Sequence, residues 1–362
     1  MLPDPRDGLA LIKPAVRGQS AYTLEASQAS RKLNQNESPL DLPPELKRRI
    51  LERVAAAAWH RYPEFAPGAL LADLARRVGW TGDGILVGNG SNELIQASLT
   101  VLLEAGDVTV APAPTFALYR LLTSVLGGRY VPVPLREDFS YDVDALVEAA
   151  RRERAKVVVV NSPNNPTGSV LPEGAVERLL AETSAFIICD EAYQEFGGPT
   201  ALPLLHQSSR LIVLRTFSKA MGMAGLRFGY GLAHPAVVKE IAKAKLPYNV
   251  NALTLIAAAT ALQDGAALAE RVTSIVQERE RTIARLRTLE GVTVFPSAAN
   301  FVLMRFHKVP ARVVFQRLLS DYGILVRDVS GGAGLAECLR LTIGTREDMD
   351  ATVSALEAIL RA

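Results

Sequence analysis

The feature that most constrains the fold is the alternation of short apolar runs with amphipathic stretches between about residues 85 and 233. The apolar runs are ILVGNG, VTVAP, YVPVPL, KVVVVNSP, FIICDEA, LIVLRTFS and FGYGLA. Such strand-then-helix alternation favours an α/β architecture around a largely parallel sheet. The run at 157–160 has no polar alternation, as expected for a central strand buried on both faces. Because open α/β sheets bind ligands beyond the carboxyl ends of their strands, the residues that follow these runs are the candidates for a functional site.

The rest of the chain follows a different pattern. After about residue 250 a long Ala/Leu-rich helical stretch precedes VTVFPSAANFVLMRF, a helix near 310–322, ILVRDV, ECLRLTIG and a final helix. This order predicts a smaller α+β domain over 251–362, beside a large domain over 51–250. Residues 1–50 contain too few apolar runs for a core of their own, so we expect them to form an arm that packs with the small domain.

Charge and composition exclude several classes of function. Forty Lys and Arg residues against 38 Asp and Glu residues leave a net charge of +2, without the basic surface typical of nucleic-acid binding. No run of about 18 apolar residues predicts a membrane span, and the N-terminus does not resemble a secretion signal. The two cysteines, Cys189 and Cys338, form neither a disulfide framework nor a metal-spacing pattern. We therefore expect a cytoplasmic protein that acts on small molecules without a metal.

The most informative stretch is RTFSKAMGMAGLRFGY at 215–230. Lys219 directly follows an apolar strand, where a partly desolvated amine can act as a nucleophile toward a carbonyl. Taken alone, a lysine at a strand end is more often a solvated loop residue. The hydroxyls of Thr216 and Ser218 and the guanidinium of Arg227 favour the functional interpretation, because together they suit a phosphate.

A second strand ends in an acidic residue, in FIICDEAY at 186–193. Asp190 can partner a protonated ring nitrogen of pyridoxal phosphate (PLP), which must stay protonated to withdraw electrons. The alternative is that Asp190 or Glu191 caps the following segment. Tyr193 could donate to the ring hydroxyl of the same cofactor, and Cys189 is expected in the strand core.

Two loops complete the candidate site. NSPNNPTG at 161–168 predicts an irregular loop in which Asn165 could reach the cofactor ring oxygen, although these are also ordinary turn residues. VGNGSNE at 87–93 places Ser91 at a predicted helix N-cap, where backbone N–H groups can bind phosphate. A further helix is expected to begin at Thr115 and Phe116, and the Phe116 ring could stack on the cofactor or belong to the core.

Together these motifs resemble the fold-type I, aspartate-aminotransferase-like PLP enzymes, and within them the histidinol-phosphate branch. The resemblance extends from LNQNESP at 33–39 to LRLTIG at 339–344. It implies a large domain with a mainly parallel seven-stranded sheet, and Lys219 as the Schiff-base lysine. It also implies Asp190 at the ring nitrogen, Tyr193 and Asn165 at the ring oxygen and Phe116 on the ring face, where this branch often has tyrosine.

The resemblance assigns the remaining site residues as well. The cofactor phosphate would be held by Ser91, Asn92, Thr216, Ser218 and Arg227, and by Tyr62 of RYPE reaching across a homodimer. Arg340 would bind the amino-acid carboxylate. Arg327 would handle the substrate phosphate, with Tyr22 and Asn36 nearby in the substrate-binding site.

The implied reaction transfers an amino group between L-histidinol phosphate and 2-oxoglutarate, giving imidazole-acetol phosphate and L-glutamate in histidine biosynthesis. An aromatic or broad-range aminotransferase, or a decarboxylase of a phosphorylated amino acid, would share the cofactor-binding motifs. A non-catalytic binding relative is a further alternative, against which the presence of both Lys219 and Asp190 argues.

Overall fold

The computed structural model describes residues 6–19 and 29–361, and it contains two main sheets. The larger sheet has seven strands in the order β2-β8-β7-β6-β5-β3-β4. These strands are β2 (Ile85–Asn89), β3 (Val108–Ala113), β4 (Arg129–Pro134), β5 (Val157–Asn161), β6 (Phe186–Asp190), β7 (Leu211–Thr216) and β8 (Phe228–Ala233). Six of these strands run in one direction, and β8 runs in the opposite direction between β2 and β7. The α/β class and the mainly parallel seven-stranded sheet predicted from the sequence are confirmed.

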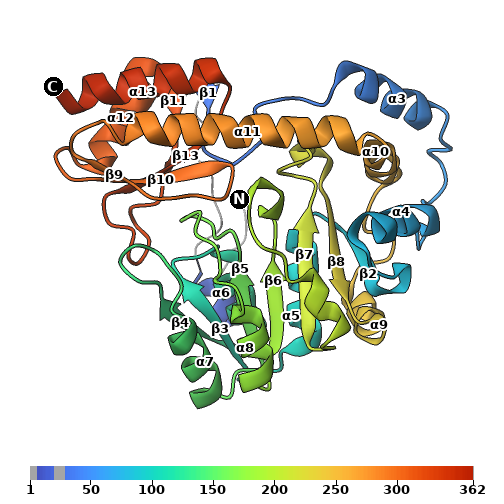
Figure 1. Ribbon diagram of the computed structural model, residues 1–362. Coiled ribbons are helices and arrows are strands. Elements are labelled where there is room, and N and C mark those ends of the chain that lie inside the picture. Colours follow the sequence, from blue (N-terminus) through green and yellow to red (C-terminus); the bar gives the residue numbers. More distant parts are fainter. Residues whose placement is uncertain (1–5, 20–28, 362) are drawn as a thin grey trace.

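Helices cover both faces of this sheet (Figure 1). One face packs on α5 (Ser91–Leu102), α6 (Leu118–Val125) and α9 (Pro235–Ala244), and the other on α7 (Val143–Arg152) and α8 (Ala175–Glu182). The side-chain alternation of β5 explains this arrangement, because Val157 and Val159 face one helical layer while 158 and 160 face the other. A strand buried on both faces must be apolar throughout, as the sequence indicates.

The second sheet is antiparallel, in the order β12-β13-β10-β9. Its strands are β9 (Val292–Val294), β10 (Phe301–Phe306), β12 (Arg327–Asp328) and β13 (Cys338–Thr342). It packs with α11 (Gly265–Leu286) and α12 (Ala311–Tyr322), and α13 (Arg346–Arg361) lies against both helices. In Figure 1, α11 extends from α10 (Ala252–Leu262), above the strand ends of the large sheet, to this second sheet.

The N-terminal part of the chain pairs with a later strand to form a separate two-stranded sheet and packs on a later helix. Its short strand β1 (Arg31–Lys32) pairs in parallel with β11 (Ile324–Leu325), and α3 (Pro44–Ala55) packs on α10. The remaining helices here are α1 (Arg6–Ala10), α2 (Pro14–Arg17) and α4 (Gly68–Val78). The division into an arm over 1–50 and domains over 51–250 and 251–362 stays a prediction. The helix just beyond residue 250, α10, packs on α3, α4 and β8, which precede it in the sequence.

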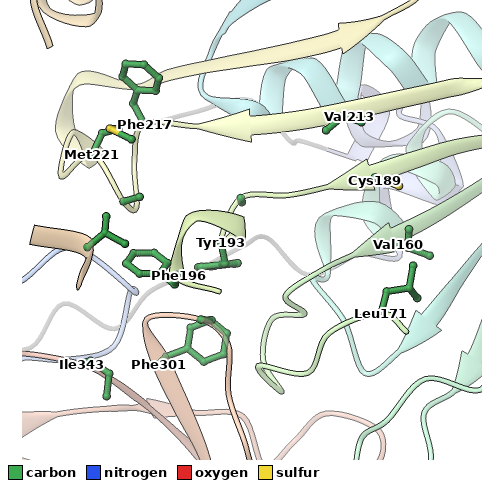
Figure 2. Close-up of a cluster of buried hydrophobic side chains, with 14 of the residues drawn as sticks. Val160, Leu171, Cys189, Tyr193, Phe196, Val213, Phe217, Met221, Phe301 and Ile343 are labelled. Atoms are coloured by element: carbon green, nitrogen blue, oxygen red, sulfur yellow. The ribbon is translucent and has the colours of Figure 1, made fainter. Parts of the chain in front are cut away.

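A continuous apolar core joins the large sheet to the second sheet (Figure 2). Val160, Cys189 and Val213 extend from the central strands, while Phe301 lies on β10. Tyr193 lies between them, with its ring 5.2 Å from that of Phe301 at an interplanar angle of 86°. The two sheets therefore hold the segment after β6 in a fixed position.

Among the residues that the structure describes, no single helix is long and apolar enough to cross a membrane. The pair α10 and α11 passes together by length and composition alone, with a bend of 85° between the two helices.

Candidate active site

The candidate site lies where the strands of the large sheet end together. Since β2, β3, β5, β6 and β7 are parallel to one another, the segments that follow them meet at one edge. The chain moves outward from β3 to β4 and in the opposite direction from β5 to β6, and such a switch point leaves a crevice at the carboxyl edge. A cavity of about 480 Å³ lies there. It is lined by Asn34, Gln35, Asn36, Ser91, Asn92, Phe116, Asn161, Asn165, Asp190, Ala192, Tyr193, Thr216, Ser218, Lys219, Arg227 and Arg340.

Lys219 follows β7 and projects into this cavity. Its Nζ donates to the backbone carbonyl of Gln35 at 2.8 Å. Burial lowers the pKa of Lys219 to about 7, and the positive charge of Arg340 acts in the same direction. A lysine in this state is neutral in a large share of molecules near neutral pH, which makes it a competent nucleophile.

Asp190 is the last residue of β6 and is buried. Its Oδ2 accepts a hydrogen bond from the hydroxyl of Tyr119 at 2.7 Å, and its Oδ1 accepts one from the backbone N–H of Ala192 at 3.1 Å. Burial raises the pKa of Asp190 to about 6, against the opposing effect of these two hydrogen bonds. Asp190 therefore does cap the segment that follows β6, through its bond with Ala192, as the alternative interpretation suggested. The same carboxylate also lines the cavity.

The neighbouring carboxylate has a different role. Glu191 forms a buried ion pair with Arg215 at 2.8 Å and accepts from the hydroxyl of Thr200. It also accepts from the backbone N–H of Ala201. Glu191 thus stabilises the segment that follows β6.

Asn165 and Tyr193 are each held by hydrogen bonds with other polar groups. Asn165 Oδ1 accepts from Arg340 Nη1, and its backbone N–H donates to Asn161 Oδ1 at 2.9 Å. Tyr193 Oη accepts from Asn36 Nδ2 at 3.0 Å. The predicted pair is therefore ordered by partners from three segments of the chain, which carry Asn36, Asn161 and Arg340.

The turn between β2 and α5 forms a narrow cradle. A Cβ on Gly90 would lie 2.4 Å from Arg227 Nη2, and one on Gly229 would lie 2.4 Å from the backbone nitrogen of Ser91. Arg227 Nη1 donates to Ser218 Oγ at 3.0 Å. Backbone N–H groups at the start of a twelve-residue helix, beside a guanidinium, suit a phosphate.

Two sequence expectations about helix starts are wrong. The N-cap of α5 is Gly90, with φ 78°, and Ser91 is the first helical residue, because only glycine tolerates both that φ and the close approach of Arg227. The next helix, α6, begins at Leu118 rather than at Thr115. Thr115 Oγ1 instead donates to Asn164 Oδ1 at 2.7 Å, which fixes the preceding loop.

The hydroxyl of Thr216, predicted to bind the cofactor phosphate, is engaged in hydrogen bonds within the protein. Its hydroxyl donates to the carbonyl of Phe228 at 3.1 Å and accepts from the backbone N–H of Ser218 at 3.1 Å. It lines the cavity, but these bonds give it a role in shaping the loop that carries Ser218 and Lys219.

Of the four predicted substrate residues, two line the cavity. Arg340 on β13 lines the cavity, and its Nη2 donates to the carbonyl of Asn34 at 2.7 Å. Asn36 lines it as well. Arg327, on β12, is not among the lining residues, although it is paired with Arg340 across the two strands. Tyr22 lies outside the described residues.

Tyr62 lies away from the cavity. It is 80% exposed and stacks on Tyr248, with ring centroids 4.5 Å apart. Within this single chain the structure therefore does not bring Tyr62 together with the other predicted cofactor residues.

Four lining residues and one residue behind the cavity were missed by the sequence reasoning. Asn34, Gln35, Asn161 and Ala192 contribute largely through backbone groups or through loop contacts, which leave no sequence signal. Tyr119 was missed although it lies three residues after Phe116, a spacing that places two side chains near one another.

The residues present fit PLP. A nucleophilic lysine, a buried carboxylate, an aromatic ring and a phosphate cradle surround one cavity, and each matches one part of that cofactor. The cradle is the most demanding feature, because side chains at Gly90 or Gly229 would fill it.

Comparison with known proteins agrees with this geometry. The family model described as aminotransferase class I and II matches residues 31–356. Histidinol-phosphate aminotransferase of Thermoanaerobacter pseudethanolicus is 38% identical over 350 residues, covering 97% of this chain and 99% of that protein. The enzyme of the same name from Chlorobaculum parvum is 38% identical over 355 residues, covering 98% and 99%.

The same similarity holds in three dimensions. The crystal structure of histidinol-phosphate aminotransferase from Sinorhizobium meliloti, in complex with pyridoxal-5'-phosphate, superposes with a TM-score of 0.88 at 28% identity. That match covers 97% of this chain and 98% of the other. The chain belongs to the aminotransferase class I and II family.

Proposed function

We propose that this protein catalyses PLP-dependent transamination between L-histidinol phosphate and 2-oxoglutarate, giving imidazole-acetol phosphate and L-glutamate. The observation that carries the chemistry is that Lys219, Asp190 and the cradle at Gly90 border one cavity. The observation that favours the substrate is the similarity over nearly the whole chain to enzymes named for it.

Most of the predicted site residues that line the cavity have a role in this proposal. When bound, PLP supplies an aldehyde that exchanges amines and a protonated ring that withdraws electrons from the substrate Cα. Lys219 Nζ would hold the cofactor and would also accept and return the proton taken from the substrate Cα. The Asp190 carboxylate keeps the ring nitrogen protonated. Asn165 and Tyr193 meet the ring oxygen, and Phe116 covers the ring face.

Different residues are proposed to bind the cofactor phosphate and the anionic groups of the substrates. Ser91, Asn92, Ser218 and Arg227 hold the cofactor phosphate, with Thr216 supporting their loop.

Arg340 meets the carboxylate of glutamate, because a guanidinium pairs with it through two parallel hydrogen bonds. Arg327 is opposite Arg340 on an antiparallel strand, and side chains at such positions extend from the same face. Arg327, with Asn36 and Tyr22, is therefore proposed to meet the substrate phosphate.

We further infer a homodimer with shared active sites. Trp59, Tyr62, Phe65, Leu246 and Tyr248 are each more than 40% exposed, and Tyr248 contacts both Tyr62 and Phe65. A cluster of exposed apolar side chains is typical of a protein interface. In this proposal Tyr62 reaches the cofactor phosphate of the partner subunit. The cytoplasmic location expected from the sequence stays a prediction.

The decisive experiment adds L-histidinol phosphate to PLP-loaded protein in the absence of 2-oxoglutarate. We expect the visible absorbance of the bound cofactor to disappear as imidazole-acetol phosphate forms in equal amount. Lys219→Ala should show neither change.

If the cofactor responds instead to phenylalanine or aspartate, the protein is an aminotransferase of a different substrate class. Release of CO₂ from a phosphorylated amino acid would favour a decarboxylase. Failure to bind PLP would contradict the proposal as a whole.

A further inference from the structure

Tyr119 lies behind the cavity and contacts two of its walls. It is the second residue of α6 and has no exposed surface. Its hydroxyl donates to Asp190 Oδ2 at 2.7 Å. Its ring meets that of Phe116 edge to face, with centroids 5.7 Å apart and an interplanar angle of 87°. One buried side chain thus contacts both the proposed partner of the ring nitrogen and the proposed cover of the ring face.

The surroundings of Asp190 oppose its ionised form. The titratable groups that face it come from several elements: Tyr119 on α6, Tyr141 before α7, Cys189 and Glu191 on its own segment, and Tyr193 beyond it. Glu191 is itself paired with Arg215 on β7. Burial is the largest effect and raises the pKa of Asp190 to about 6, while the hydrogen bond from Tyr119 is the largest influence in the opposite direction. Without the phenol, the carboxyl would hold its proton more tightly.

We propose that Tyr119 is a positioning residue whose hydroxyl keeps Asp190 as an oriented carboxylate facing the ring nitrogen of PLP. This inference rests on the proposed cofactor site. The proton in question can lie on the ring nitrogen or on Asp190. A donor at Oδ2 stabilises the carboxylate and so favours the proton on nitrogen. Loss of that donor shifts the proton from the ring nitrogen to the aspartate oxygen, with no other atom transferred.

The test replaces Tyr119 by Phe, which keeps the ring and its contact with Phe116 while removing the hydroxyl. The readout is the ¹⁵N chemical shift of ring-labelled PLP bound to the protein. We expect a protonated nitrogen in the unaltered protein and a marked shift toward the neutral value in Tyr119→Phe. We also expect the affinity of the apo-protein for PLP to fall about fivefold near pH 6, and about tenfold at lower pH, for a rise of one unit in the pKa of Asp190.

Tyr141→Phe is the matched control. Tyr141 is also a buried tyrosine next to the site, but its hydroxyl donates to the carbonyl of Asn161 rather than to Asp190. The ¹⁵N shift should be unchanged in this variant. Equal shifts in both variants, or no shift in Tyr119→Phe, would overturn the inference and leave the proposed function intact. If the unaltered protein binds no PLP, the proposed function and this inference are both wrong.

Should Tyr119→Phe fail to fold, fluorinated tyrosine incorporated at position 119 serves as the second variant. A more acidic phenol is a stronger donor, so the acid limb of PLP binding should move to lower pH. An acid limb that stays in place or moves to higher pH would contradict the role assigned to Tyr119.

Discussion

Lys219 is surrounded by groups that favour its neutral form. Because burial lowers its pKa from 10.5 to about 7, the amine loses its proton as the pH rises through that value. We therefore expect the rate at which apo-protein captures PLP to rise through about pH 7 and to level off above it. Stopped-flow absorbance measures this rate.

A rate that continued to rise tenfold per pH unit up to about pH 9 would indicate an ordinary solvated lysine. Since the charge of Arg340 contributes to the lowered pKa of Lys219, Arg340→Gln should move the midpoint upward.

Arg340 gives a second prediction at this scale. Its guanidinium donates to Asn165 and to the carbonyl of Asn34 at the edge of the cavity. Because a hydrogen bond to a charged group contributes about 1.5–3 kcal/mol, Arg340→Gln should raise KM for L-glutamate about 10- to 100-fold. Steady-state kinetics with glutamate as the amino donor measures this.

Arg305→Gln is the control for that measurement. Arg305 lies on the adjacent strand β10 but does not line the cavity. Its replacement should leave KM for glutamate unchanged. Similar values of KM for both variants would remove Arg340 from the proposed carboxylate site.

Among elements, the turn from β2 into α5 makes the strictest demand on sequence. Gly90 combines a φ of 78° with the close approach of Arg227. In Gly90→Ala the new methyl group would displace the guanidinium from the phosphate cradle. We expect the affinity for PLP to fall at least about tenfold, because one charge-assisted contact is lost. Fluorescence titration of the apo-protein with PLP measures the change.

Gly79→Ala separates backbone strain from the loss of the cradle. Gly79 ends α4 with a φ of 69°, and a Cβ there would meet no atom within 4 Å. Both variants should lower the melting temperature, since alanine is strained at such a φ. Only Gly90→Ala should weaken PLP binding, and an equal effect of both on affinity would contradict the cradle.

The presence and type of the helices and strands could be predicted better than the residues at which they begin and end. In β5 and β6 the apolar runs located the strands, and Asp190 ends β6 as expected, whereas β5 extends one residue further than predicted, to Asn161. The starts of α5 and α6 were wrong by one and three residues. Those positions depend on contacts with Arg227 and Asn164, which are distant in the sequence.

For the whole molecule, the proposed shared active site can be tested by mixing two defective proteins. Lys219→Ala lacks the nucleophile and Tyr62→Ala lacks the proposed contact from the partner subunit. A 1:1 mixed population of dimers should recover about a quarter of normal activity at limiting PLP, because half the dimers contain one intact site of two.

The outcome depends on where Tyr62 acts. If Tyr62 served only its own subunit, no site in a mixed dimer would combine Lys219 with Tyr62, and mixing would give no gain in activity. Sedimentation of the unaltered protein as a monomer would also contradict the shared site.

The sequence by itself determined the α/β class and the parallel sheet. It also placed the chemical groups that follow each strand, including Lys219, Asp190 and Asn165. This was possible because strand periodicity is local, and parallel strands bring their carboxyl ends to one edge whatever the rest of the chain does.

Only the tertiary structure decided which partners control those groups. The carbonyls of Asn34 and Gln35 reach Arg340 and Lys219 through a segment that pairs with β11, almost 300 residues later. Tyr119 reaches Asp190 because α6 packs on the face of the large sheet to which Ile188 of β6 extends, and Asp190, two residues later, extends to the same face. Such contacts depend on register and packing between distant segments, and no local pattern of residues encodes them.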